Sequence, residues 1–229
     1  MPHNLIPSIE QRLSGLVEVT RRVQGEISSS KPKFKPTVTI SREFGCEAYP
    51  MAEKLKSLLE KKTGSSWALM DKALLEEVAK NHNVSEEILK NLGTKPRFLD
   101  DIISTFSPNW KSDKDHYRIL CRHIISLATA GNVIIVGRGG AVVTRTLENC
   151  YHFRLVAPGE YKVGSIAKRL GISLNEAQEM VLSRQQVRDK FVKDFLNRSL
   201  DDPTLYHMVF NNARSSTEKI ADTIVHYMF

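Results

Sequence analysis

Cysteines are scarce in this sequence, and their spacing excludes two common kinds of stabilised domain. The three cysteines, Cys46, Cys121 and Cys150, are odd in number, widely spaced and form no CxxC pair. This pattern argues against a disulfide framework or a zinc site and is typical of a reducing compartment, so we expect a cytoplasmic protein. The 7 histidines show no HxxH or HxH spacing, so none is assigned as a metal ligand.

Long apolar runs are also absent. The longest, VIIV, is far shorter than the ~20 residues that a membrane-spanning helix needs. The opening residues, MPHNLIPSIEQ, lack a basic segment followed by an apolar stretch, so we expect no signal peptide. The sequence therefore predicts no membrane partner.

The charge balance is basic. With 33 Lys and Arg against 26 Asp and Glu, the net charge is +7 and the pI is about 9.3. Such a protein attracts polyanions, including nucleotides and nucleic acids. Nucleic acid is the less favoured partner, because the sequence shows neither interleaved aromatic and basic residues nor a helix-turn-helix signature.

Apolar segments of strand and helix type alternate along the chain of 229 residues. The predicted strands are TVTIS, SWALMD, VIIV, HFRLVAP and YHMVFNNA. Such alternation indicates an α/β fold with a doubly wound parallel sheet, whose ligands lie at the carboxyl ends of the strands.

The predicted organisation has two parts, an N-terminal helix with its linker over residues 1–36 and an α/β domain over 37–229. Residues 6–27 have helical periodicity and would form a packing arm or a contact between copies of the chain. Residues 81–114 are polar and broken by Gly and Pro, which predicts a helical insertion over a cleft near the substrate site.

The segment SREFGCEAYP is the first candidate site. A turn from a strand into a helix points backbone N–H groups and the positive end of the helix dipole at a ligand. Gly45 can supply an unusual backbone angle, and Arg42 can add positive charge from the side. The segment lacks the G-x-x-x-x-G-K-[ST] pattern of a standard phosphate loop. An ordinary strand-to-helix turn is an equally good interpretation of these residues.

Arginines supply the second set of candidates. Arg138 follows the apolar strand VIIV directly, where it can bind a phosphate or form a salt bridge; its position favours the first. Arg184 and Arg188 share a helical face and, with Arg169, can close over transferring phosphates. Their spacing alone favours a solvated face. Asp71, after the second strand, can serve a metal or hydroxyl group or cap the next helix.

A resemblance to the cytidylate kinase-like family, within the P-loop nucleoside monophosphate kinases, rests on TISREFG, LMDKALLEEVA, VIIVGRGG, FRLVAP, KRLGISLNEA, RQQVRDKF and DDPTLYHMVFNNAR. The resemblance extends from about Thr37 to Tyr227. It implies a three-layer fold with a phosphate loop and an arginine-bearing lid over residues 159–200. It also implies transfer of the γ-phosphate of ATP, with Mg²⁺, to a nucleoside monophosphate such as CMP.

The resemblance also assigns roles to individual residues. The phosphates of ATP would be bound by the loop residues Gly45, Cys46, Glu47, Ala48 and Tyr49. Asp71 matches the acidic residue after the second strand, Arg138 the arginine that binds the substrate phosphate, and Arg184 and Arg188 the lid. The segment around the last strand is matched by Asp202, Pro203, Tyr206 and Arg214.

Three features depart from the family pattern. Residues 45–49 read GCEAY where the family usually has G-S-G-G-[RK], so the loop cation is replaced and an acid is present. Gln185 stands where the lid often has Asp, and Ala141 where an acid often follows GRG. Loss of a loop cation can cost ~10²–10⁴-fold in rate. The alternative to an active kinase is therefore a catalytically weakened nucleotide-binding or regulatory protein on the same fold.

Overall fold

The structure, a computed structural model, describes residues 9, 16, 35–80 and 113–229. Most of the predicted N-terminal helix over 6–27 and nearly all of the insertion predicted over 81–114 lie outside the described residues. Ile9 and Leu16 are both helical, and Leu16 is buried in the core.

Five parallel strands form the central sheet, in the order β2-β3-β1-β4-β5. They are β1 (Thr37–Arg42), β2 (Ala68–Met70), β3 (Val133–Val136), β4 (Cys150–Val156) and β5 (Met208–Asn211). Ile40 in β1 lies opposite Val136 on one side and Phe153 on the other. Because the strands are parallel, the segments that follow β1, β3 and β4 leave the sheet at the same edge. The α/β fold with a parallel sheet predicted from the sequence is confirmed.

One face of the sheet is covered by α2 (Ala48–Thr63) and α10 (Thr217–Met228), which lie side by side. Met51 and Leu55 of α2 and Ile224 of α10 are fully buried against Ile40 and Phe153. Full burial of such side chains stabilises the fold by about 1.5–3 kcal/mol each.

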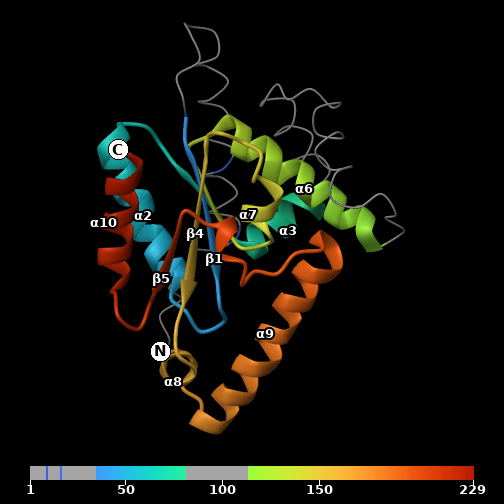
Figure 1. Cartoon of the computed structure of the whole chain (residues 1–229), viewed down its shortest axis with the longest axis vertical. Coiled ribbons are helices and arrows are strands. Elements are labelled where there is room, and N and C mark those ends of the chain that lie inside the picture. The colour runs from blue at the N-terminus through green and yellow to red at the C-terminus, as the bar shows by residue number, and fades with distance from the viewer. Residues whose placement is uncertain (1–8, 10–15, 17–34, 81–112) are drawn as a thin grey trace, which may run out of the picture.

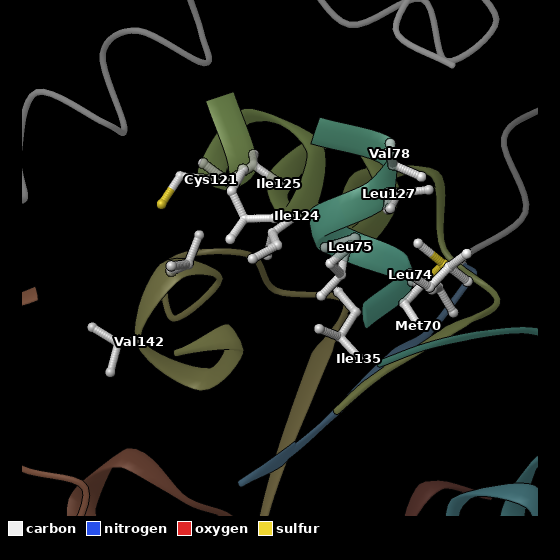
Figure 2. Close-up of a cluster of buried hydrophobic side chains, with 14 of the residues drawn as sticks. Met70, Leu74, Leu75, Val78, Cys121, Ile124, Ile125, Leu127, Ile135 and Val142 are labelled. Carbon is white, nitrogen blue, oxygen red and sulfur yellow. The ribbon is translucent and has the colours of Figure 1, made fainter. Parts of the chain in front are cut away.

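The opposite face is covered by α3 (Lys72–Lys80), α6 (Asp113–Ala130) and the short α7 (Gly140–Val143). Figure 2 shows Leu74 and Leu75 of α3 and Ile124 of α6 gathered over Ile135 of β3. The strand β3 is thus buried on both sides, as the uniformly apolar run VIIV predicts. The three-layer arrangement is confirmed.

Two helices, α8 (Gly159–Leu170) and α9 (Leu174–Leu196), form a hairpin after β4. Helix α9 extends past the carboxyl ends of the strands (Figure 1). The spacing of Ser173 and Glu176 in the sequence predicts a capping box, and it is confirmed at the start of α9, since the two residues cap each other's backbone N–H groups. A turn, η1 (Pro203–Leu205), leads from this hairpin to β5.

The start of the last helix differs from the prediction. The spacing of Ser215 and Glu218 predicts a capping box there, but the cap is Ser216, whose hydroxyl accepts from the Lys219 N–H. Serine is a favoured cap at either position, so the path of the chain decides between them. The helix α7 has no periodic sequence signal, because it is four residues long. Among the described helices, none has the length and apolar character that crossing a membrane requires.

Candidate functional site

A cleft of about 430 Å³ lies at the carboxyl edge of the sheet, between the ends of β1 and β3 and the helix α9. This volume is within the usual range for small-molecule sites, roughly 300–1,000 Å³. The described residues that line it include five cations and no acid. The cations are Arg42, Lys72, Arg138, Arg184 and Arg188. Apolar side chains from α9, with Phe44, complete the wall.

Arg42 is the last residue of β1, and its guanidinium lies against the backbone at Gly137, in the turn that follows β3. A Cβ added to Gly137 would overlap the Arg42 guanidinium, so this position requires glycine. Gly137 also has a φ of +85°, which favours glycine independently. The glycine after VIIV therefore makes room for a partly buried arginine, in addition to turning the chain.

The positive charges of Arg42, Arg188 and Lys72 are disfavoured by burial, which lowers the pKa of each side chain. Burial lowers the pKa of Arg42 from 12.5 to about 9, and repulsion from Arg188 adds to this, whereas Asp71 opposes it. Burial likewise lowers the pKa of Arg188 to about 10. The pKa of Lys72 is lowered by burial and then by the surrounding arginines, Arg138 first. A site that raises the free energy of its own positive charges is stabilised by an anion.

Arg138 forms a salt bridge, one of the two roles that its position in the sequence left open, and phosphate binding, the other, stays a prediction. Its side chain lines the cleft, pairs with Glu76 and lies over the ring of Phe191, 4.7 Å from the ring centre. Its φ of +52° is unusual for a residue with a side chain, and its carbonyl accepts from the Tyr117 hydroxyl at 3.1 Å. Such a backbone outlier persists only where the surroundings fix it, as at ligand sites.

The lid arginines are not simply a solvated face. Arg188 is partly buried, lies over the Phe44 ring at 5.0 Å and donates to the Arg42 carbonyl at 3.3 Å. The solvated-face interpretation is therefore wrong for Arg188. Arg184, one turn earlier, lines the cleft while its side chain remains exposed. Arg169, which the sequence groups with them, is exposed near the end of α8.

The loop after β1 is packed closely against its neighbours. The Phe44 N–H donates to the Gln185 side chain of α9, and the Glu47 N–H donates to the buried Asn212 side chain after β5, both at 2.8 Å. Gly45 has a φ of +99°, so the predicted special backbone angle is present. Two of the loop amides thus already have side-chain acceptors.

The remaining loop residues lie beside the cleft rather than in its wall. None of Gly45, Cys46, Glu47, Ala48 and Tyr49 is among the lining residues, and the loop reaches the cleft through Phe44. The apolar spacing after Pro50 predicts a helix from that residue, and α2 begins two residues earlier, at Ala48. Burial raises the pKa of the Cys46 thiol to about 11, so it is protonated and unreactive at neutral pH.

The other predicted site residues are distributed around this centre. Asp71 caps α3, since its carboxylate accepts from the Leu74 N–H at 3.0 Å, and it also acts electrostatically on Arg42. The capping interpretation of Asp71 is confirmed. Arg214 is exposed and is not among the residues that line the cleft. Asp202 caps the turn η1.

A second set of charged residues, which the sequence did not predict, lies next to the loop after β1. Glu43 pairs with Lys162 of α8 at 2.8 Å, and its carboxylate also accepts from the Ala157 N–H at 3.2 Å. Arg154 in β4 is 4% exposed, pairs with Asp201 at 2.6 Å and lies 4.0 Å from Glu43. A charged residue within the apolar strand HFRLVAP was the available signal for Arg154. Glu43 and Lys162 are 119 positions apart, so no spacing rule connects them.

Comparison with known proteins places these features in a family context. A model of the cytidylate kinase-like family matches residues 37–214. A cytidylate kinase of Ignicoccus hospitalis is 30% identical over 103 residues, which are 45% of this chain and 59% of that protein. A cytidylate kinase of Staphylothermus marinus is 27% identical over 97 residues, 42% of this chain and 54% of that protein. The chain thus spans little more than half the length of these relatives.

A solved structure supports the fold. The crystal structure of an uncharacterized protein from Eubacterium ventriosum superposes with a TM-score of 0.68, over 85% of this chain and 98% of that one. The two sequences are 19% identical, so the likeness concerns the fold alone.

Proposed function

Because the chain belongs to the cytidylate kinase-like family, we propose that it is a phosphotransferase that moves the γ-phosphate of ATP to a nucleoside monophosphate or a similar small phosphorylated acceptor. The observation that carries the proposal is the cleft, where five cations converge at the carboxyl edge of the parallel sheet and no acid is among the described lining residues. Phosphoryl transfer needs little beyond positioning and charge stabilisation, and such a cleft supplies both.

The cations divide naturally between two tasks. Arg42 and Arg138 extend from the ends of β1 and β3, so they are fixed by the sheet and would bind the acceptor phosphate. An oxygen of that phosphate attacks the γ-phosphorus, and the bond to the β–γ bridging oxygen breaks, which releases ADP. Arg184 and Arg188 on α9 would stabilise the charge that develops on the transferring group.

Mg²⁺ in this reaction would be bound mainly by the phosphates, as is usual for kinases. Within the described part of the chain, no group of three or more His, Cys, Asp or Glu side chains is placed to hold a metal ion. Asp71, which lies near enough to Arg42 to influence its pKa, is the carboxylate that would contribute a ligand or a water-mediated contact. When bound, Mg²⁺ would neutralise charge on the β- and γ-phosphates.

The alternative function is nucleotide binding without turnover. It is favoured by the loop, where Glu47 brings an acid to the start of α2 and two amides already have side-chain acceptors. Such a protein would bind ATP or a monophosphate in the same cleft without transferring phosphate.

A turnover assay separates the two functions. Full-length protein is incubated with ATP, Mg²⁺ and each nucleoside monophosphate in turn, and ADP formation is followed. We expect conversion of at least one monophosphate, and a loss of 10²-fold or more in Arg188→Ala. Lys190→Ala, an exposed change on the same helix, is the matched control and should retain activity. Nucleotide binding without ADP formation would support the alternative, and neither binding nor turnover would refute both.

A further inference from the structure

The loop after β1 lacks a basic side chain between Gly45 and Tyr49, yet a lysine from another element lies against it. Lys162 is in the first turn of α8, directly after the end of β4. A Cβ added to Gly45 would come within 2.6 Å of the Lys162 Cβ and 2.9 Å of its Cα and carbonyl oxygen. Gly45 is therefore the residue that allows α8 to approach the loop.

The lysine side chain is held at the loop by a partly buried ion pair. Its ammonium lies 2.8 Å from the carboxylate of Glu43, and the two side chains are 15% and 21% exposed. The same carboxylate oxygen accepts from the Ala157 N–H, which fixes Glu43 against the end of β4. Burial raises the pKa of the Cys46 thiol, and the charge of Lys162 acts in the opposite direction, as expected of a cation that lies close to the loop.

We propose that Lys162 supplies, from α8, the phosphate-binding cation that the loop itself lacks, and that Glu43 positions it. This inference rests on the proposed function, because it assigns a residue to the triphosphate of the same nucleotide. An ammonium has three donors, so Lys162 can keep its bond to Glu43 and still donate to a phosphate oxygen. Arg188 lies over the ring of Phe44, the residue before Gly45, and both cations act electrostatically on Cys46, so a phosphate at the loop would lie near two cations.

The position of Lys162 on the lid has a physical consequence. The helices α8 and α9 pack together, so a cation on α8 and the arginines on α9 belong to one hairpin. A triphosphate bound to Lys162 would therefore stabilise the same hairpin that carries Arg184 and Arg188. A lysine within the loop would hold the phosphate without this connection to the lid.

An ion pair that only stabilises the fold makes a different prediction from a phosphate ligand. In the structural case, removal of either partner costs stability and affects nucleotide binding equally. In the ligand case, the two removals have opposite effects. Loss of Lys162 removes a charge-assisted contact with phosphate, whereas loss of the Glu43 charge removes a competing anion from the ammonium.

The test uses four variants of the full chain, Lys162→Met, Lys162→Arg, Glu43→Gln and Lys168→Met. Lys168 is exposed on the same helix and serves as the matched control. Affinity for ATP with Mg²⁺, and for inorganic tripolyphosphate, is measured by calorimetry, and thermal unfolding reports on folding. We expect Lys162→Met to weaken binding of both ligands on the order of 10- to 100-fold, and Lys162→Arg to restore most of it. Glu43→Gln keeps an oxygen that can accept from the ammonium and removes the competing charge, so it should bind at least as tightly as wild type.

The outcomes separate this inference from the proposed function. If wild-type protein binds ATP and Lys162→Met binds it equally well, the inference is overturned and the proposed function stands. Equal weakening in Lys162→Met and Glu43→Gln, with equal losses of thermal stability, also overturns it in favour of a structural ion pair. If wild type binds neither ATP nor tripolyphosphate, the proposed function and the inference fail together.

Discussion

Replacing Arg42 by methionine should stabilise the ligand-free protein while it removes anion binding from the cleft. Methionine retains much of the length and apolar surface of the arginine stem but carries no charge. Arg42 lies among four other cations in the cleft and is desolvated there, with Asp71 as the carboxylate that opposes this effect. The substitution to methionine therefore removes a positive charge that burial and the neighbouring cations disfavour.

The pKa of Arg42 sets the scale of the effect. A fall from 12.5 to about 9 corresponds to a ceiling of about 5 kcal/mol, at roughly 1.4 kcal/mol per pKa unit. Because the folded pKa is the lower one, this penalty is fully present below pH 9 and is relieved as the pH rises toward 12.5. Water reaches part of the side chain, so we expect a gain of about 2 kcal/mol in the free energy of unfolding at pH 7.

Urea unfolding at pH 7, followed by circular dichroism, measures this gain. The expected change corresponds to about 4–8 °C in melting temperature for a chain of this size. Arg198→Met, an exposed change outside the cleft, is the control and should remain within about 0.5 kcal/mol of wild type. Tripolyphosphate should stabilise wild type and not Arg42→Met, because only the former has the full anion site. An Arg42→Met variant less stable than wild type would refute the electrostatic argument.

Three further predictions follow from individual contacts. Burial lowers the pKa of His152 to about 4, so the unfolded chain binds more protons below pH 6.5. His152 should therefore contribute a fall of about 3 kcal/mol in the free energy of unfolding between pH 6.5 and 4, in addition to that of His123, whose pKa burial also lowers to about 4. Urea titrations at a series of pH values should show a fall that is smaller by about this amount in His152→Asn. Gln185→Ala removes the side chain that accepts from a loop amide, so ATP should bind a few-fold more tightly by calorimetry; weaker binding would contradict this. Gly137→Ala should weaken tripolyphosphate binding more than Gly64→Ala, since both have positive φ but only a Cβ at Gly137 would meet Arg42.

The parts of the fold that could be predicted are those whose signals are local. The run VIIV indicates a strand buried on both faces, and the pair Ser173 and Glu176 marks the start of a helix; both are confirmed. Arg138 could be singled out because it follows a buried strand directly, and the structure places it in the cleft wall.

What could not be predicted depends on contacts between distant segments. The sequence gives no reason why Gln185, rather than a ligand, should accept from the Phe44 amide, because the two residues are 141 positions apart. The same holds for Asn212 and the Glu47 amide, 165 positions apart. From the sequence, Arg188 was expected on a solvated face, because helical spacing shows only which residues share a face. That this face packs against Phe44 depends on tertiary structure, which the spacing does not reveal.

The central claim is that the loop and the cationic cleft form one site for two phosphorylated substrates. A dinucleoside pentaphosphate that joins adenosine to cytidine through five phosphates would span both parts. Calorimetry with this bisubstrate analogue should show binding at least 10²-fold tighter than ATP alone, and Arg138→Met should lose most of that difference. Affinity no greater than that of ATP, or binding that Arg138→Met leaves unchanged, would contradict the claim.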